Sequence, residues 1–600
     1  ITAMPNLVTT AATSVGALDS GSITSGFGTI DTGSSNITTT GVGAFGSLDI
    51  SGDIDVDGTT NLDAVDVDGA VNFAADVTFA DGADIITASA GTSNFRAGVN
   101  AGNSIQSGGN FNTVLGDEAG TAITTGDDNV AVGYAAGDAM TTGSYNAIVG
   151  KNSGGAITTG VENVSVGWNS LDALTEGGQN VALGASALGS DTLGSRSVAV
   201  GYQALTTQNF TTATDAHNTA VGYKAGEAVT TGANNTIIGA NTGIALTSGS
   251  NNNLIGGLAG DALTTGHSNN IMGVSCGTAL TDADYNVAIG QQALNSDTLG
   301  SQTVAIGSFA LSAQNYTTAT NSLNTAVGYA AGAAITTGDQ NALIGGLAGD
   351  ALTVGRRNTA IGVSTLSTDT KGDLSVAIGF GALDTQNFTT STETDNTAVG
   401  AFAGLGVTSG LSNTLIGTNA GDTITTGDFN CIVGADSDTS IANAQARMVL
   451  GFGVSNPTDN SVRIGAGGNF ISNTFTSNAT WAHSSDERLK ENIQNDTLGL
   501  SFIKDLRPVT FTWKKQEDVP EELKSRFEKD TGTHHGIIAQ EVKAALDTAG
   551  VSDFTGWSSD EGTGTQLVSE SMFVYPLIKS VQELSTALDA ALARIAVLEG

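Results

Sequence analysis

The sequence predicts a mostly β protein: a long parallel β-solenoid or β-roll shaft, followed by a small C-terminal α+β domain that ends in a helix. Three observations support this fold class. A 17-residue pattern recurs through the middle of the 600 residues, Gly accounts for 81 residues while only 13% are charged, and the composition changes abruptly near Ser485. Such a composition is unusual for a globular enzyme and favours a repeat architecture.

Residues 1–100 form an N-terminal region of short alternating polar and apolar segments broken by Gly and Asp. This alternation is typical of short strands with one buried face, either as part of the shaft or as an attachment region. Asp53, Asp55 and Asp57 match the first half of a calcium-binding loop. The twelfth position of that loop is Ala64, where a bidentate Glu is required. Asp-Gly turns are therefore favoured, and no metal site is predicted.

Residues 101–466 carry the regular repeat. An anchor of the form Asn-x-x-(Val/Ile/Leu)-Gly recurs, with some substitutions, from Asn112 to Arg447 in nineteen steps, sixteen of 17 residues and three of 21. A fixed repeat this short predicts a solenoid whose coils stack on their neighbours. The three longer steps carry related inserts of the type TTQNFTTATDAHN.

Each coil is expected to contain two strands: the anchor segment, and a segment centred on the apolar residue eleven positions later, such as Ile123 or Met140. Glycines four and fourteen positions after the anchor, such as Gly133 and Gly143, are expected at turns, where a positive φ favours Gly. Stacked Asn side chains at the anchors are expected to hydrogen-bond along the shaft axis.

The short coil also bears on the oligomeric state. A 17-residue coil encloses space for about two rows of small side chains, so one chain is expected to bury little. We therefore expect a trimeric shaft in which three chains share a core, about 90 Å long at about 4.8 Å per coil. The strands resemble the head repeats of trimeric autotransporter adhesins, whose coils are shorter.

Charge and cysteine content exclude several classes of function. The net charge of −38 argues against binding to nucleic acid or to anionic membranes. It divides into −30 before Ser485 and −8 from there on. Cys276 and Cys431 are far apart, so neither a disulfide framework nor a metal-ligand spacing exists, and no cofactor is expected. No apolar run is long enough to span a membrane, so membrane insertion is not expected either.

After the connector at residues 467–484, residues 485–576 differ from the shaft and contain the ordered segments SDERLKENI, LGLSFIKDLRPVTFTWK, HHGIIAQEV and VYPLIKSVQEL. By themselves, Ser484 and Glu487 predict a helix-capping box. The segments nevertheless closely resemble the endosialidase-type intramolecular chaperone family, found at the C-terminus of phage tail spikes and fibres. The resemblance extends from the start of this block to the C-terminus.

In that family an S-D-x-R-x-K element is a self-cleavage site with a Ser-Lys dyad. The resemblance implies that Ser485 is the nucleophile and Lys490 its base, with Asp486 and Arg488 in support. A serine hydroxyl needs such a base, and a neutral Lys can serve. The implied cleavage lies between Ser484 and Ser485. Being five positions apart, the two dyad residues are expected to meet in a turn or across neighbouring chains.

Residues 577–600 carry a heptad pattern that predicts a trimeric coiled coil. Its apolar positions are Leu577, Val581, Leu584, Leu588, Ala591, Ile595 and Leu598. A shaft of near-identical coils can slip by one coil at little local cost, so a C-terminal trimeriser is expected to set the register. Its later removal would make the shaft kinetically stable.

These features predict a homotrimeric phage tail fibre or a similar virion appendage for host attachment, made in the host cytoplasm and acting outside the cell. The expected partners are the virion tail or baseplate at the N-terminal end and a host surface receptor, either a glycan or an outer-membrane component. The insert aromatics Phe210, Tyr316 and Phe388 are candidate receptor contacts. Single-turnover self-cleavage is the only enzymatic activity expected.

Two alternatives stay open. One is a tailspike polysaccharide depolymerase, which needs paired carboxylates at a hydrolytic separation. The few Glu residues of the shaft, among them Glu118, Glu162 and Glu176, fall in different coils and suggest no such pair. The other alternative is a bacterial trimeric surface adhesin.

Overall fold

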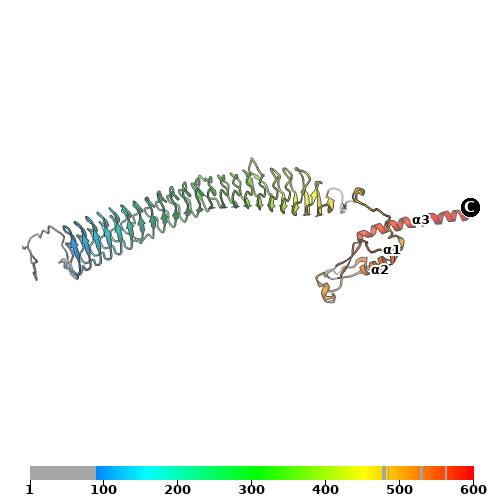
Figure 1. Ribbon diagram of the computed structural model, residues 1–600, viewed down its shortest axis with the longest axis horizontal. Coiled ribbons are helices and arrows are strands. Elements are labelled where there is room, and N and C mark those ends of the chain that lie inside the picture. The colour runs from blue at the N-terminus through cyan, green and yellow to red at the C-terminus, as the bar shows by residue number, and fades with distance from the viewer. Residues whose placement is uncertain (1–89, 476–481, 484, 527–531, 561–563) are drawn as a thin grey trace, which may run out of the picture. The chain divides into compact units, whose positions relative to one another are not determined.

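The computed structural model describes residues 90–475, 482–483, 485–526, 532–560 and 564–600 (Figure 1). It confirms the predicted fold class, with a β-solenoid shaft and a small C-terminal domain of helices and short strands. Most of the predicted N-terminal strand region, including the Asp-rich half-match to a calcium loop at 53–57, lies outside the described residues.

The shaft, coloured blue to yellow in Figure 1, is a stack of coils that each add one strand to a 24-stranded sheet. Successive strands are parallel and in register, so Val130 pairs with Ala147 and Ala147 with Val164. The parallel strands are β1 (Phe95–Ala97), β2 (Thr113–Leu115), β3 (Val130–Val132), β4 (Ala147–Val149), β5 (Val164–Val166), β6 (Val181–Leu183), β8 (Val198–Val200), β10 (Thr219–Val221), β11 (Thr236–Ile238), β12 (Asn253–Ile255), β13 (Asn270–Met272), β14 (Val287–Ile289), β16 (Val304–Ile306), β18 (Thr325–Val327), β19 (Ala342–Ile344), β20 (Thr359–Ile361), β22 (Val376–Ile378), β24 (Thr397–Val399), β25 (Thr414–Ile416), β26 (Cys431–Val433), β28 (Arg447–Phe452) and β30 (Ser461–Ala466).

In the described coils the segment that follows each anchor is a strand, whereas the segment centred eleven positions after the anchor is not, so the prediction of a second strand there is wrong. The apolar residue eleven positions after the anchor is fully buried, as Ile123 and Met140 are. However, the backbone N–H of Ile123 donates to the Gly120 carbonyl of its own coil at 3.1 Å. Because this donor is used within a tight turn, it cannot join a ladder between coils.

Glycine is required at these two repeat positions for different physical reasons. Gly133, four positions after its anchor, has a φ of 133°, as predicted. Gly143, fourteen positions after the anchor, is not among the residues with positive φ, so that prediction is wrong. A Cβ on Gly143 would lie 2.5 Å from the carbonyl oxygen of Gly160 in the next coil. Gly143 is therefore required by the close approach of two coils.

Each chain closes its own hydrophobic core inside the coils. The middle residue of each strand points inward, and Ala131 and Ile148 are fully buried. They pack with the residues eleven positions after the anchors, such as Ile123, in one core that is continuous along the shaft. A single chain therefore buries more apolar surface than the short repeat suggested.

The predicted Asn ladder is confirmed. Asn129 Nδ2 donates to Asn112 Oδ1 at 3.1 Å and to the Gly143 carbonyl at 2.9 Å, and its backbone N–H donates to the same Asn112 oxygen. The structure contains one more coil before the first anchor identified in the sequence. Asn94 lies 18 residues before Asn112, and its Oδ1 accepts hydrogen bonds from the backbone N–H and from Nδ2 of Asn112. Each buried amide thus has partners, as a buried polar group requires.

The 21-residue coils repair a break in this ladder. They occur where the anchor is Ser or Thr, such as Ser197. These residues have no side-chain amide, so they cannot continue the row of amide hydrogen bonds from one coil to the next. The insert residue Gln208 fills the gap: its Nε2 donates to Ser197 Oγ and to Asp191 Oδ2, and its Oε1 accepts from Asn218 at 2.8 Å. The other two inserts build the same network with their own Gln.

Two-residue parallel strands lie beside the main sheet at the three inserts and near the end of the shaft. The pairs are β7 (Gly194–Ser195) with β9 (Thr214–Asp215), β15 (Gly300–Ser301) with β17 (Thr320–Asn321), β21 (Gly372–Asp373) with β23 (Thr392–Glu393), and β27 (Asp438–Thr439) with β29 (Ser455–Asn456).

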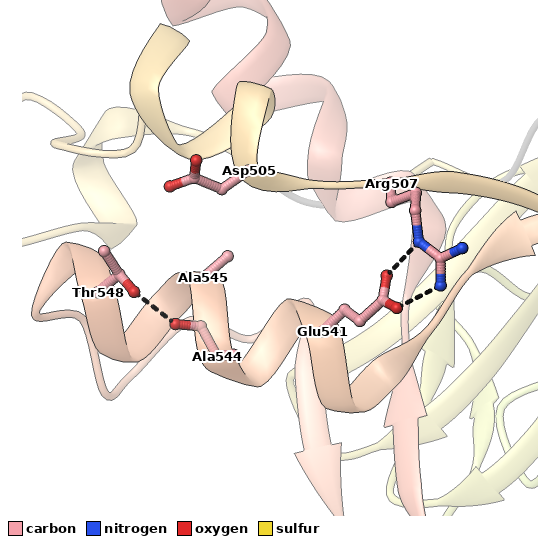
Figure 2. A pocket seen from close by; sticks show the side chains of 6 residues that line it. All are labelled: Asp505, Arg507, Glu541, Ala544, Ala545 and Thr548. Carbon is pink, nitrogen blue, oxygen red and sulfur yellow. Dashed lines mark hydrogen bonds and ion pairs between the residues drawn. The ribbon is translucent and has the colours of Figure 1, made fainter.

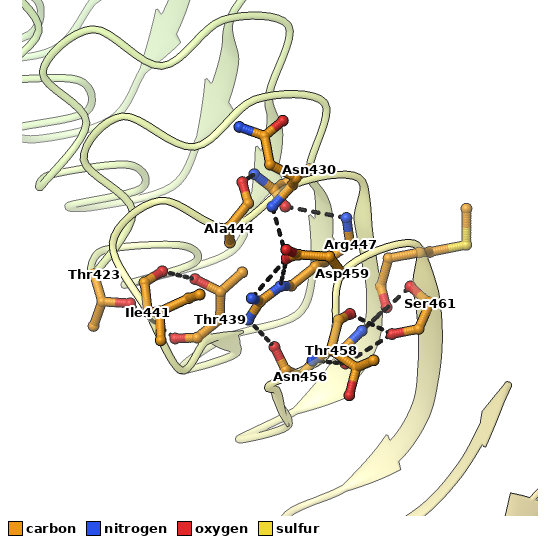
Figure 3. A network of polar contacts seen from close by, with 12 residues as sticks. Thr423, Asn430, Thr439, Ile441, Ala444, Arg447, Asn456, Thr458, Asp459 and Ser461 are labelled. Carbon is orange, nitrogen blue, oxygen red and sulfur yellow. Dashed lines mark hydrogen bonds and ion pairs between the residues drawn. The ribbon is translucent and has the colours of Figure 1, made fainter. Parts of the chain in front are cut away.

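The ladder ends at Arg447, which occupies an Asn anchor position and is 1% exposed (Figure 3). Its backbone N–H donates to Asn430 Oδ1 at 3.1 Å. Its guanidinium instead turns to new partners, donating to Asp459 Oδ1 and to the Asn456 carbonyl, each at 2.7 Å. Beyond β30 the sheet turns antiparallel through β31 (Asn469–Thr474) and β32 (Ala482–His483), so the parallel stack stops here.

The C-terminal domain has a separate small core formed by residues such as Leu498, Phe502, Val542, Leu546 and Phe573. Its elements are η1 (Glu487–Leu489), α1 (Leu500–Asp505), β33 (Pro508–Phe511), η2 (Gln516–Asp518), η3 (Glu521–Arg526), β34 (His534–Ile537), α2 (Ala539–Ala549), β35 (Trp557–Ser559), β36 (Gln566–Val568), η4 (Glu570–Phe573) and α3 (Val574–Glu599). The strands form two antiparallel pairs, β33 with β34 and β35 with β36.

An exposed ion pair joins the segment after α1 to α2 (Figure 2). Arg507 donates through Nε and Nη2 to the two carboxylate oxygens of Glu541. The pair lowers the pKa of Glu541 and raises that of Arg507. Because both side chains are solvated, the ion pair orients the segment after α1 relative to α2 and adds little to the free energy of unfolding.

Helix α3 carries the predicted heptad and begins at Val574, slightly before the expected boundary. The apolar heptad side chains are exposed, at 47% for Leu577, 50% for Leu584 and 59% for Leu588. The helix is therefore confirmed, while the coiled coil stays a prediction. None of the helices in the described part of the chain is both long and apolar enough to cross a membrane.

Candidate self-cleavage site

The motif SDERLK forms an exposed turn at the start of the C-terminal domain. Asp486 is the N-cap of η1, and its carboxylate accepts a hydrogen bond from the backbone N–H of Arg488 at 2.9 Å. The predicted capping box involves Ser484, which lies outside the described residues, and the described cap of η1 is Asp486. The single 3-10 turn decides where the side chains after it point.

This turn brings the two dyad residues together within one chain. Lys490 Nζ donates to Ser485 Oγ at 2.7 Å. A proton can pass directly between two heavy atoms at this distance, which is the geometry that a serine nucleophile and its base need. The arrangement therefore does not require a lysine from a neighbouring chain.

Asp486 and Arg488 form a separate pair beside the dyad. Arg488 donates to both carboxylate oxygens, through Nε at 3.0 Å and Nη2 at 2.6 Å. The hydrogen bonds from Arg488 lower the pKa of Asp486, and the pairing raises the pKa of Arg488. Among the described residues no carboxylate lies within ion-pair distance of Lys490. The Asp486 carboxylate is thus engaged by Arg488.

The candidate receptor aromatics are buried in the single chain. Phe210, Tyr316 and Phe388 are 7%, 6% and 8% exposed. The Tyr316 hydroxyl donates to the Gly338 carbonyl at 2.7 Å, and burial raises its pKa. The hypothesis of receptor contact assumed exposed rings, and the structure instead places them as packing for the inserts. Their Thr-rich neighbours gave the sequence the appearance of a surface loop.

Other aromatic side chains are exposed along the shaft, one or two positions after the Gly that ends a strand. Tyr202 and Tyr223 on neighbouring coils stack with ring centroids 5.6 Å apart. Edge-to-face pairs occur at the other two long coils, Phe309 with Tyr329 and Phe380 with Phe402. The sequence analysis did not identify these aromatic pairs, one of which marks every long coil.

Neither cysteine nor the acidic residues form a metal site among the described residues. Cys276 is buried and donates weakly to the Ala288 carbonyl, and burial raises its pKa to about 12. Cys431 is partly exposed on β26. Asp438 and Asp422 share a hydrogen bond, which is much closer than the separation of roughly 5–9 Å between glycosidase carboxylates.

Residues 485–551 match the family model described as chaperone of endosialidase. This part of the C-terminal domain is therefore similar to the endosialidase chaperone family. The match begins at Ser485, the serine of the dyad. A long β-solenoid shaft followed by this chaperone domain fits a phage tail fibre or tail spike. Searches with the chain found no match among curated proteins or solved structures.

Proposed function

We propose that the protein is the shaft-forming chain of a phage tail fibre or tail spike that attaches the virion to a host surface, and that its endosialidase-type chaperone domain releases itself by cleavage between Ser484 and Ser485. The observation that carries the cleavage proposal is the 2.7 Å contact from Lys490 Nζ to Ser485 Oγ at the first residue of the matched region. Host attachment and virion location rest on the combination of shaft and chaperone domain.

The chemistry needs only this chain and water. Neutral Lys490 removes the proton from Ser485 Oγ, which attacks the carbonyl carbon of Ser484. The C–N bond breaks as Lys490 returns the proton to the leaving amine, so an ester joins Ser484 to Ser485 Oγ. Water then attacks the ester, giving a carboxylate on Ser484 and restoring the Ser485 hydroxyl. One turnover therefore separates the shaft from residues 485–600.

Burial of the dyad is the step that assembly can supply. Both side chains are exposed to solvent in the single chain. A homotrimer in which neighbouring chains cover the dyad would desolvate it and favour the neutral amine. Cleavage would then follow assembly, and the register of the coils would be set before the chaperone leaves.

The test is the intact mass of the purified protein beside three variants. Wild type is expected to yield two fragments that meet between Ser484 and Ser485, whereas Ser485→Ala and Lys490→Met yield the full-length chain. Glu491→Gln is the matched control, since it changes an exposed charge next to the dyad, and it should cleave as wild type does. A wild type that stays at full length, or a Ser485→Ala variant cut at the same bond, would overturn the cleavage proposal.

For host contact the exposed aromatic pairs are better candidates than the buried insert rings. Tyr202 is 47% and Tyr223 is 51% exposed, and stacked rings offer a flat apolar surface with polar hydroxyl groups at its edge, which suits a glycan. Replacement of both by Ala is expected to weaken adsorption of the fibre to host cells. Unchanged adsorption would exclude this pair as the contact.

A further inference from the structure

The outward face of the shaft sheet carries an unbroken aliphatic row. Three positions after every anchor from Asn112 to Arg447, the strand residue points away from the core of its own chain. The most exposed members reach 36–46%, as for Val149 and Leu450. The row consists of Leu115, Val132, Val149, Val166, Leu183, Val200, Val221, Ile238, Ile255, Met272, Ile289, Ile306, Val327, Ile344, Ile361, Ile378, Val399, Ile416, Val433 and Leu450.

The neighbouring outward row, one position after each anchor, contains no charged residue either; it holds mainly Val, Thr, Ala and Asn. This contrasts with the net charge of −30 for the chain before Ser485. Along a strand, the side chains that face water are normally polar and alternate with apolar side chains that face the core. Two uncharged rows along twenty strands of the sheet therefore mark a surface that is covered in the assembled protein.

The long coils do not interrupt these rows. Val200 pairs with Val221 across the first insert, Ile306 with Val327 across the second, and Ile378 with Val399 across the third. The extra residues of each long coil leave the sheet register unchanged. The face is therefore a continuous strip from the first counted coil to the last.

We propose that this strip is where copies of the chain pack against each other, coil against the same coil, along the whole shaft. The proposal rests on the homotrimer of the proposed function and names the surface that builds it. A partner must offer one apolar side chain every coil over the same length, and a second copy of the chain does so. Rotation about an axis parallel to the shaft keeps equal coils at equal heights, so the rows match without any shift.

The strip is large enough for a stable interface. Twenty strands at about 4.8 Å spacing and about 10 Å strand length give a footprint of about 960 Å² per chain. A standard stable interface buries about 800 Å² per partner. The aliphatic content also agrees with homo-oligomer interfaces, which are more apolar than transient ones.

A polar margin borders the strip on the side where the strands begin. On neighbouring coils Gln179 donates to Glu162 at 2.8 Å, Arg196 donates to Gln179 at 2.9 Å, and Arg196 pairs with Asp215 at 2.6 Å. Charged residues thus occur next to the uncharged rows but not within them. An apolar centre with a polar rim is the usual anatomy of a protein interface.

The chain carries a natural probe for this surface. Cys431 lies one position after its anchor, on the outward side of β26, whereas Cys276 is buried in the core. A short bismaleimide added to the wild-type protein is therefore expected to link two copies of the shaft through Cys431. Cys431→Ser should abolish the link. Cys431→Ser combined with Thr142→Cys moves the thiol to an exposed position outside the strip and should also give no link.

A second measurement tests the strip itself. Val149→Asp with Val166→Asp places charges on two adjacent coils, and we expect heat-resistant trimers to be lost; Thr125→Asp with Thr142→Asp is the control with equal charge elsewhere. If the Val variant aggregates, co-expression with Val149→Lys and Val166→Lys should restore soluble mixed trimers. Failure to restore them overturns the proposal.

The possible results distinguish the proposal of the packing strip from the proposal of a homotrimer, on which it rests. A wild type that sediments as a trimer but gives no Cys431 link, or strip variants as heat-resistant as wild type, would overturn the strip alone. A monomeric wild type would overturn the homotrimer as well and leave the strip to a different partner. Cleavage between Ser484 and Ser485 is read separately, from the mass of the products.

Discussion

Lys490 can activate Ser485 only if its side chain can lose a proton. Arginine has the same charge and at least the same reach, but its guanidinium stays protonated in proteins. Lys490→Arg is therefore expected to keep the fold and to abolish cleavage, with full-length chain as the only product in mass spectra. Detectable cleavage in this variant would show that the residue at 490 acts through its charge and not as a base.

Asp438, near the end of the shaft, predicts a pH dependence. Burial, strengthened by the hydrogen bond with Asp422, raises its pKa from 3.8 to about 6. A raised pKa means that the folded state holds the proton more tightly, so the stabilisation is complete below about pH 4 and is lost as pH rises through about 6. Amide protection of the last coils should be roughly tenfold higher at pH 5 than at pH 7.5. Asp438→Asn should remove this difference.

At the residue scale the sequence supported some predictions and not others for physical reasons. The anchor Asn was identifiable because its chemistry depends on residue type at a fixed spacing, whereas the Ser-Lys pair was implied only by the resemblance to a known family. The contact between Ser485 and Lys490 within one chain could not be predicted from the sequence, because it depends on the single turn of η1. The burial of Phe210 was also hidden, because its Thr-rich insert has the composition of a surface loop.

Among the elements, the missing second strand has a simple cause. The residues between the buried Ile123 and the next anchor, Asn129, are buried at every third position, as Gly126 shows, and not at every second one. A strand requires the period of two, so this side of the coil takes a different backbone path. An isolated apolar residue in a Thr-rich segment could not distinguish these two periods.

Two glycines provide a matched test of coil spacing. Gly143→Ala would place a Cβ 2.5 Å from the Gly160 carbonyl oxygen, so we expect a loss of about 2 kcal/mol or more in local stability. Gly346→Ala meets no atom within 4 Å and should be neutral or stabilise by about 0.4–1 kcal/mol. Hydrogen exchange at the flanking coils measures both. If both substitutions changed local stability equally, contact between coils would not be the reason that glycine is required at position 143.

For the whole molecule, the solenoid predicts tolerance to loss of complete coils. Deleting residues 113–163 joins Asn112 to Val164 and removes three repeats while every remaining strand keeps its register. This variant is expected to fold, with a melting temperature within a few degrees of wild type and a shaft shorter by about 14 Å. Deleting only residues 113–138, one and a half repeats, should unfold the junction because inward and outward residues are exchanged.

The Gln that repairs the Asn ladder in each long coil has a practical consequence. The four additional residues leave and rejoin the coil at points fixed by Gln208 and its equivalents, while the strands above and below stay paired. The chain thus contains three sites, at different heights along one shaft, where foreign peptides can be grafted without altering the supporting backbone. A natural fibre of this design is already a display scaffold, with spacing between displayed loops set by the number of coils between them.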